Sequence, residues 1–185
     1  MKNLIKLILP LLLVLTGCKK EVNAPDRTDT DMAANGRTGM FVKTPLKVNF
    51  YAIPDFTQGY VECMPAEFGV KLAKKLNIGG TATHFGQLQM ANSYLEHTMC
   101  YMGPQQFQLT AISNGLIVAA NGDIGTFVAK YVTNAWDMTF TGTVTMTGGT
   151  GRFEGCSGEV LMTGSQDVNT MKVSWTADGF IMMKK

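Results

Sequence analysis

Residues 136–147 read WDMTFTGTVTMT and carry the clearest indication of the fold class. Large apolar residues stand at every second position from Trp136 to Met146 except at Gly142, and the positions between them hold Asp137 and threonines. Because successive side chains of a strand point to opposite faces, the pattern predicts a β-strand with one buried face and one wet face. A helix would mix the two sets around its circumference.

The same alternation recurs along the chain and is separated by turn signals. Residues 46–52 and 171–176 alternate in this way, and Asn121-Gly122 and 148–151 carry turn residues that tolerate positive φ. We therefore predict eight long strands joined by tight turns. They are expected near residues 46–52, 76–84, 86–96, 106–120, 123–132, 135–147, 152–164 and 170–182. Residues 66–75 fit either one or two helical turns or an irregular strand.

The N-terminus has the layout of a secretory signal. Lys2 and Lys6 flank an apolar run over residues 7–15, which is shorter than the roughly 20 residues of a membrane-spanning helix. The run ends in Leu-Thr-Gly-Cys, a lipobox whose cysteine is Cys18. We predict that residues 1–17 are a lipoprotein signal peptide and that Cys18 carries the lipid that anchors the mature chain to a membrane. An ordinary signal peptide with an unrelated cysteine is the alternative.

Residues 18–42 comprise the lipidated cysteine and a polar stretch without hydrophobic period, so we expect a flexible tether followed by one domain over residues 43–185. Lys19 follows the cysteine where an aspartate would signal retention in the inner membrane. The expected location is therefore the bacterial outer membrane, on either its periplasmic or its surface face. A membrane-spanning barrel is a rival fold, but its lipid-facing strands should be apolar with aromatic girdles, and the anchor would be redundant.

The composition narrows the range of partners. The 185 residues include 16 basic and 14 acidic ones, and removal of residues 1–17 deletes Lys2 and Lys6, which leaves 14 of each. A neutral chain without a basic stripe lacks the positive charge for binding nucleic acid, because that binding depends on neutralising phosphates. The sequence leaves the oligomeric state open.

Three cysteines remain after Cys18. The exported compartment is oxidising, so we expect one disulfide and one free thiol. Cys63 and Cys100 stand at loop or strand-end positions and are the expected pair, whereas Cys156 stands in a strand pattern and is expected to be a small buried residue. Their spacing does not match a zinc ligand set.

Residues 149–158 read GTGRFEGCSG, which resembles the Gly-Thr-Gly-Arg-Phe-x-Gly-Ala-x-Gly segment of allene-oxide-cyclase-like and dirigent-like barrels. Residues 80–86, together with residues 119–123, are similar to segments of uncharacterised Bacteroidetes lipoproteins and secreted proteins that share this barrel. The resemblance covers most of residues 46–183 and implies a closed antiparallel eight-stranded β-barrel, an arrangement that leaves no exposed strand edge.

In this motif, Gly149 and Gly151 are expected to form a turn, and Gly155 and Gly158 to let a strand bend or approach a neighbour closely. Phe153 would then plug one end of the barrel and Arg152 would cap it. Cys156 and Ser157 replace the usual small apolar residue and threonine. Catalytic residues of allene oxide cyclase cannot be placed on this chain by a matching motif, so the resemblance does not imply that activity.

Few residues suggest chemistry by themselves. Residues 97–102 (His-Thr-Met-Cys-Tyr-Met) gather soft ligands that suit copper, but methionine is spread through the strand patterns as core filler, so we expect no metal and no cofactor. His84 is either a general base or, more simply, a hydrogen-bond partner of a neighbouring strand or turn. Glu96 and Asp137 interrupt apolar context and would matter if they pointed inward.

Taken together, these patterns predict a lipid-anchored barrel that binds one small apolar ligand or serves as a structural module of the envelope. The alternative is an isomerase or cyclase acting on a lipophilic molecule in the barrel cavity. A titratable residue inside an apolar cavity would favour the enzyme, and a filled interior would favour the structural module.

Overall fold

The computed structural model describes residues 39–103 and 107–185. The predicted signal peptide, Cys18 and the tether up to residue 38 lie outside the described residues. Within the described ranges, the helices are all too short or too polar to cross a membrane.

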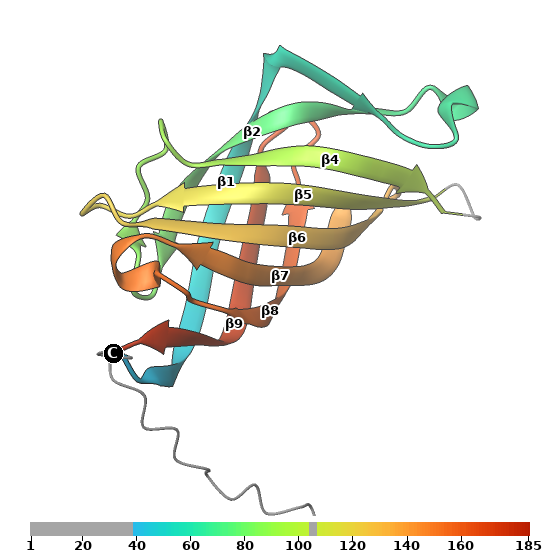
Figure 1. Ribbon diagram of the computed structural model, residues 1–185. Coiled ribbons are helices and arrows are strands. Elements are labelled where there is room, and N and C mark those ends of the chain that lie inside the picture. Colours follow the sequence, from blue (N-terminus) through green and yellow to red (C-terminus); the bar gives the residue numbers. More distant parts are fainter. Residues whose placement is uncertain (1–38, 104–106) are drawn as a thin grey trace, which may run out of the picture. The chain divides into compact units, whose positions relative to one another are not determined.

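The described residues form nine antiparallel strands and two short 3-10 helices, so the domain is all-β (Figure 1). β1 pairs with β9 along one side and with β2 along the other, which closes a ring of eight strands in the order β1-β9-β8-β7-β6-β5-β4-β2. Among the described strands, the short β3 pairs with β2 alone. The strands are β1 (Phe41–Glu62), β2 (Lys71–Ala82), β3 (Gly86–Gln87), β4 (Tyr94–Met102), β5 (Gln108–Val118), β6 (Ile124–Asn134), β7 (Thr139–Gly149), β8 (Gly158–Gln166) and β9 (Val173–Lys184).

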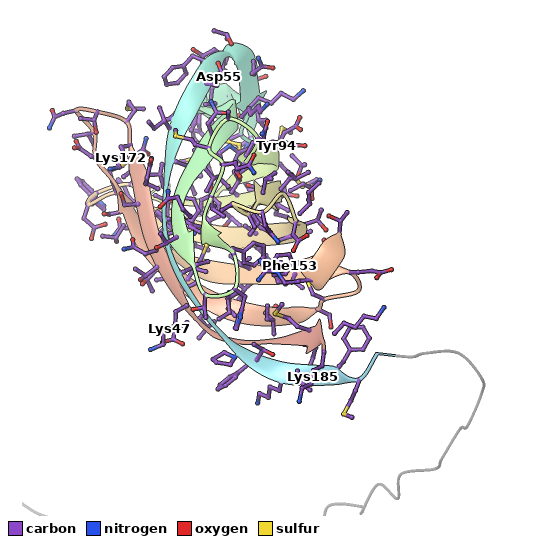
Figure 2. All side chains as sticks on the ribbon, turned by 90° about the vertical axis from the view of Figure 1, so that its left-hand side faces the viewer. Lys47, Asp55, Tyr94, Phe153, Lys172 and Lys185 are labelled. Atoms are coloured by element: carbon purple, nitrogen blue, oxygen red, sulfur yellow. A yellow bond between two sulfur atoms is a disulfide. The ribbon has the colours of Figure 1, made fainter. Side chains whose placement is uncertain are left out.

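The ring has two different ends. In Figure 1 the start of β1 (blue) lies beside the C-terminal end of β9 (red), in agreement with the pairing of Phe41 with Lys184. Figure 2 labels Phe153 and Lys185 toward this end and Asp55 toward the other. We call the end near Phe153 and Lys185 the plugged end and the end near Asp55 the cavity end.

The alternation in residues 136–147 is observed, but only from Thr139 onward. Phe140 and Met146 are buried inside the ring, and the threonines between them face outward or are partly covered. The prediction was wrong for Trp136, which is 72% exposed in the turn before β7 and packs on the exposed Phe107 with ring centroids 4.6 Å apart. The turn forms because Asn134 and Asp137 accept hydrogen bonds from the backbone N–H groups two residues further on.

The predicted strand 86–96 is also largely wrong. Residues 88–93 leave the sheet in a turn, and the strand begins again at Tyr94 and runs on to Met102. The turn is stabilised locally, because the backbone and side chain of Asn92 both donate to Gln89. Ser93 then accepts a hydrogen bond from the backbone N–H of Val118, which fixes the entry into β4.

β1 is much longer than residues 46–52. It begins at Phe41, just before the predicted domain boundary at residue 43, and shifts register between Asp55 and Tyr60 before it ends at Glu62. Both alternatives for residues 66–75 occur in part, because the 3-10 helix η1 spans Ala66–Phe68 and β2 starts at Lys71. The outer part of β1 and the start of β2 thus form a hairpin at the cavity end.

Candidate functional site

The segment 149–158 closes the plugged end. It leaves β7, turns through the 3-10 helix η2 (Gly151–Phe153) and enters β8 at Gly158. Phe153 is fully buried and stacks on Phe85 with ring centroids 3.7 Å apart. The Nε of Arg152 lies 2.9 Å from a carboxylate oxygen of Asp123 across the turn. These contacts occupy the end of the ring with side chains, so the segment has a structural role.

Glycine is required here for steric reasons. A Cβ atom at Gly149 would lie 2.0 Å from the carbonyl oxygen of Ile124, and Gly151 has a φ of +57° with Asp123 equally close. At Gly158 a Cβ would meet the backbone of Ile181 at 2.9 Å. Gly155 also has positive φ, at +67°. A side chain at these positions would push the turn away from β6 and β9.

Cys63 and Cys100 are joined by a disulfide that spans 37 residues, with their Cα atoms 4.6 Å apart. Both are buried and tie the segment after β1 to β4 near the cavity end. Cys156 is a buried free thiol in the loop before β8, and burial raises the pKa of this thiol. It therefore lies outside a strand but is buried as a small side chain.

The copper hypothesis for residues 97–102 loses its geometric basis. Cys100 is in the disulfide, and Met99 and Tyr101 point outward while His97 points inward. In the described part of the chain, no three histidine, cysteine, aspartate or glutamate side chains gather closely enough to hold a metal ion.

Three other candidates have structural contacts of their own. The Nε2 of His84 lies 3.1 Å from the carbonyl oxygen of Pro45, which is the strand-to-turn contact expected for a structural histidine. Glu96 forms an ion pair with Lys74 at 3.4 Å, half exposed on the outside of the ring. Asp137 is exposed in the turn before β7. Neither acid points into the interior.

A cavity of about 130 Å³ lies inside the ring toward the cavity end. Its deep wall is apolar and includes Leu76, Leu95, Phe127, Phe140 and Trp175. Phe127 and Trp175 also line a much smaller space of about 20 Å³ nearer the plugged end. They therefore form the floor that separates the larger cavity from the filled half of the ring.

The outer rim of the cavity is exposed. Phe56, Tyr60 and Met171 are between 40% and 56% exposed and line the cavity at the same time. Lys71 and Gln166 also contribute to the lining, and they are the polar residues of this rim together with Thr133. The cavity therefore reaches the surface through a mouth of mixed aromatic and polar side chains.

His97 and Tyr131 form a hydrogen-bonded pair in the cavity wall. The Nδ1 of His97 lies 2.7 Å from the carbonyl oxygen of Ala73, and its Nε2 accepts a hydrogen bond from the Tyr131 hydroxyl. His97 is on β4 and Tyr131 on β6, with β5 between them. They meet because β5 carries small residues on its inner face, Ser113 opposite His97 and Ala111 opposite Tyr131.

Burial decides the protonation of this pair. It lowers the pKa of His97 below its ordinary value of 6.5, and the hydrogen bond to Ala73 opposes this shift only in part. Burial also raises the pKa of Tyr131, so the phenol stays protonated, despite a smaller opposing effect of the nearby Ser113 hydroxyl. The Ser113 hydroxyl itself is buried without a hydrogen-bond partner among the described residues. At neutral pH the cavity therefore contains a neutral imidazole and a neutral phenol.

Sequence reasoning considered His97 only as a copper ligand and did not single out Tyr131. A signal was available, because Leu95 and His97, and likewise Phe127, Ala129 and Tyr131, follow the period-two pattern on the inward face of their strands. What the sequence could not show is that β4 and β6 bring these two side chains within hydrogen-bonding distance.

Comparison with protein-family models, with curated proteins and with solved structures finds no match to this chain. The site must therefore be interpreted from its own geometry. It combines an apolar cavity with a mouth and a single buried pair of polar side chains that can accept a hydrogen bond or pass a proton.

Proposed function

We propose that this protein is a membrane-anchored lipoprotein whose domain binds one small lipophilic molecule. The cavity of about 130 Å³ carries this proposal, because it has apolar walls, a mouth at the surface and a polar pair that can orient a ligand. An interior completely filled by side chains would instead have supported a purely structural envelope protein.

The size of the cavity limits what enters it. A cavity of about 150 Å³ lined by apolar side chains accommodates a benzene-sized molecule. The enclosed part of this site therefore takes one ring or a short branched chain, and a longer ligand extends past Phe56 and Met171 into the mouth.

We further propose that the ring of eight strands is a closed barrel of the allene-oxide-cyclase-like or dirigent-like type. The closed strand order supports this, as does the position of the motif residues Gly149, Arg152 and Phe153 at one end of the ring. The fold type says little about chemistry, since one fold serves many functions.

The proposed location is the bacterial outer membrane, reached through lipidation of Cys18. The sequence before Cys18 and the lysine after it support this proposal, and the disulfide between Cys63 and Cys100 suits an oxidising compartment outside the cytoplasm. The periplasmic and surface faces of that membrane remain equal alternatives.

A second candidate is an isomerase or cyclase that acts on a lipophilic molecule. The His97–Tyr131 pair favours it, because a neutral imidazole hydrogen-bonded to a phenol inside an apolar cavity is suited to proton transfer. In this reading Tyr131 contacts the substrate and His97 accepts or returns the proton.

Intact mass under native and denaturing conditions tests the binding proposal. Residues 19–185 contain every described core residue and can be exported to a periplasm behind a cleavable secretory signal. We expect extra mass in the native spectrum that is lost on denaturation. We also expect the polypeptide to be lighter than its reduced form by two hydrogen atoms, as one disulfide requires. A native mass equal to that of the bare chain, with no small lipophilic molecule in an organic extract, would contradict the proposal.

The same extract separates binding from catalysis. The released molecule is returned to fresh protein, incubated, extracted again and analysed by chromatography and mass spectrometry. An unchanged molecule supports a binding module, whereas an isomer of the same mass that the Tyr131→Phe variant does not form supports the enzyme.

A further inference from the structure

The donor and the acceptor can be assigned in both hydrogen bonds of the His97–Tyr131 pair. The carbonyl oxygen of Ala73 carries no proton, so the Nδ1 of His97 must donate to it across the 2.7 Å contact. Because burial keeps the ring neutral, its Nε2 holds a lone pair instead of a second proton. The Tyr131 hydroxyl gives its one proton to that lone pair.

The consequence is that the pair offers the cavity only an acceptor. The Tyr131 hydroxyl has one O–H, which donates a hydrogen bond to His97. Toward a ligand, the Tyr131 oxygen can therefore only accept a hydrogen bond through its lone pairs. Leu76, Leu95 and Phe140 in the deep wall carry no competing donor, and the indole N–H of Trp175 belongs to the floor of the cavity. Lys71 and Gln166 do carry donors, but they lie at the outer rim among exposed residues.

We propose that the cavity selects neutral lipophilic molecules whose buried polar group donates a hydrogen bond, namely alcohols and phenols, over ketones, ethers and carboxylates of the same shape. A ketone can accept a hydrogen bond from the Tyr131 hydroxyl only if that hydroxyl stops donating to His97, which leaves the buried Nε2 without a hydrogen-bond partner. A carboxylate would face lone pairs in surroundings of low dielectric constant. This inference rests on the proposed binding function.

Three probes with one carbon skeleton test the inference: 1-phenylethanol, which donates, acetophenone, which only accepts, and ethylbenzene, which does neither. Their affinities for residues 19–185 are measured by isothermal titration calorimetry, and the NMR resonance of the Trp175 indole N–H reports whether they enter the cavity. We expect 1-phenylethanol to bind about 5-fold or more tightly than acetophenone, as one additional hydrogen bond implies.

Two variants show which side chain sets the preference. In His97→Phe the Tyr131 hydroxyl is free to donate to a ligand, so we expect the ratio of the alcohol and ketone affinities to fall to about one or below. In Tyr131→Phe the Nε2 of His97 remains as the acceptor, so we expect the preference for the alcohol to persist. A purely structural defect would weaken all three probes together and leave the ratio unchanged.

The outcomes distinguish a failure of this inference from a failure of the proposed binding function. If none of the three probes binds the unmodified domain, the proposed binding function fails and the inference fails with it. If the probes bind but the alcohol and the ketone bind equally, the inference fails while the binding function stands. A preference for the alcohol that persists in His97→Phe overturns the role given to His97. If that variant does not fold, the ratios of the unmodified domain and of Tyr131→Phe decide.

Discussion

The two ends of the ring are built from the same strands and differ in what occupies them. At the plugged end the turn between β7 and β8 folds inward, and Phe153 stacks on Phe85 to leave a space of only about 20 Å³. At the cavity end about 130 Å³ stays open beside His97 and Tyr131. One end of the ring therefore contributes stability, while the other is available for a ligand.

The turns explain why the ends differ. At the cavity end the turns before β7 and β9 are stabilised by their own aspartates, because Asp137 and Asp167 accept hydrogen bonds from nearby backbone N–H groups. These turns leave Trp136 and Val168 exposed instead of directing them into the ring. The glycine-rich turn at the plugged end approaches β6 closely enough to carry Phe153 inside.

The strongest change in stability is expected at Phe153, the side chain that fills the plugged end. We expect Phe153→Ala to lower the free energy of unfolding by about 4 kcal/mol, because a fully buried aromatic ring is replaced by a cavity. Urea denaturation followed by tryptophan fluorescence measures the change. The matched control is Phe56→Ala at the mouth, where the ring is 47% exposed and the loss should be below about 1 kcal/mol. Equal losses at both positions would contradict the contrast between the ends.

The disulfide should matter next, and mainly at the cavity end. Replacing both Cys63 and Cys100 by alanine is expected to cost about 3 kcal/mol of stability, because the bond closes a loop of 37 residues in the unfolded chain. Amide hydrogen exchange should then increase in the hairpin of β1 and β2 and at the end of β4, while the residues around Phe153 remain protected. A uniform increase over the whole ring would show that the ends are not independent.

Stability should also depend on pH through His97. The unfolded chain protonates this histidine near its ordinary pKa of 6.5, whereas in the folded domain burial keeps its pKa lower. The unfolded state therefore binds more protons below pH 6.5, and stability falls with falling pH by up to about 1.4 kcal/mol per pH unit, until the pH passes the folded pKa. Guanidinium denaturation between pH 7 and 5 measures the slope.

Two variants assign that slope. His97→Phe should remove this slope. His84→Gln should retain it, because His84 lies in a turn outside the cavity, where its ring hydrogen-bonds the backbone of Pro45. The carboxylates whose pKa is lowered, such as Asp123 and Asp137, lose their contribution only at more acidic pH. A slope that survives in His97→Phe would show that His97 is not the group responsible.

The smallest effect is expected at Ser113. Its hydroxyl is fully buried and has no hydrogen-bond partner in the described part of the chain, so Ser113→Ala should leave stability unchanged or raise it by up to about 1 kcal/mol. Thermal and urea denaturation both report this change. A loss greater than about 1 kcal/mol would instead reveal a hydrogen bond from Ser113 to Tyr131, and would extend the polar pair to three residues.

Much of the fold could be predicted from local pattern. The alternation around Phe140 and Met146 and the turn signal at Asn121-Gly122 both correspond to observed elements. Two of the errors, at Trp136 and around Asn92, concern residues whose neighbours form turns through side chains. There, hydrogen bonds made by a few polar side chains override the apolar period. A third error is the predicted strand 152–164, whose first residues form η2 and a turn before β8 begins at Gly158.

The candidate site was much less predictable. His84, Glu96 and Asp137 were considered because of their residue type, yet each has a contact outside the cavity. His97 and Tyr131 are 34 residues apart and belong to strands that are not even hydrogen-bonded to each other. Their meeting depends on the small side chains of a third strand, which no local window of sequence contains.

The amino-acid sequence is sufficient to derive the all-β class, the inward face of most strands and the glycine-rich turn at residues 149–158. Each of these follows from the residue period, the turn residues and the steric demand within a short stretch of chain. Only the folded arrangement shows that the other end of the ring stays open, where the cavity lies and that His97 and Tyr131 form its polar pair. The physical reason is that ring closure and strand register bring distant residues together, and burial then fixes their protonation and the direction of their hydrogen bonds.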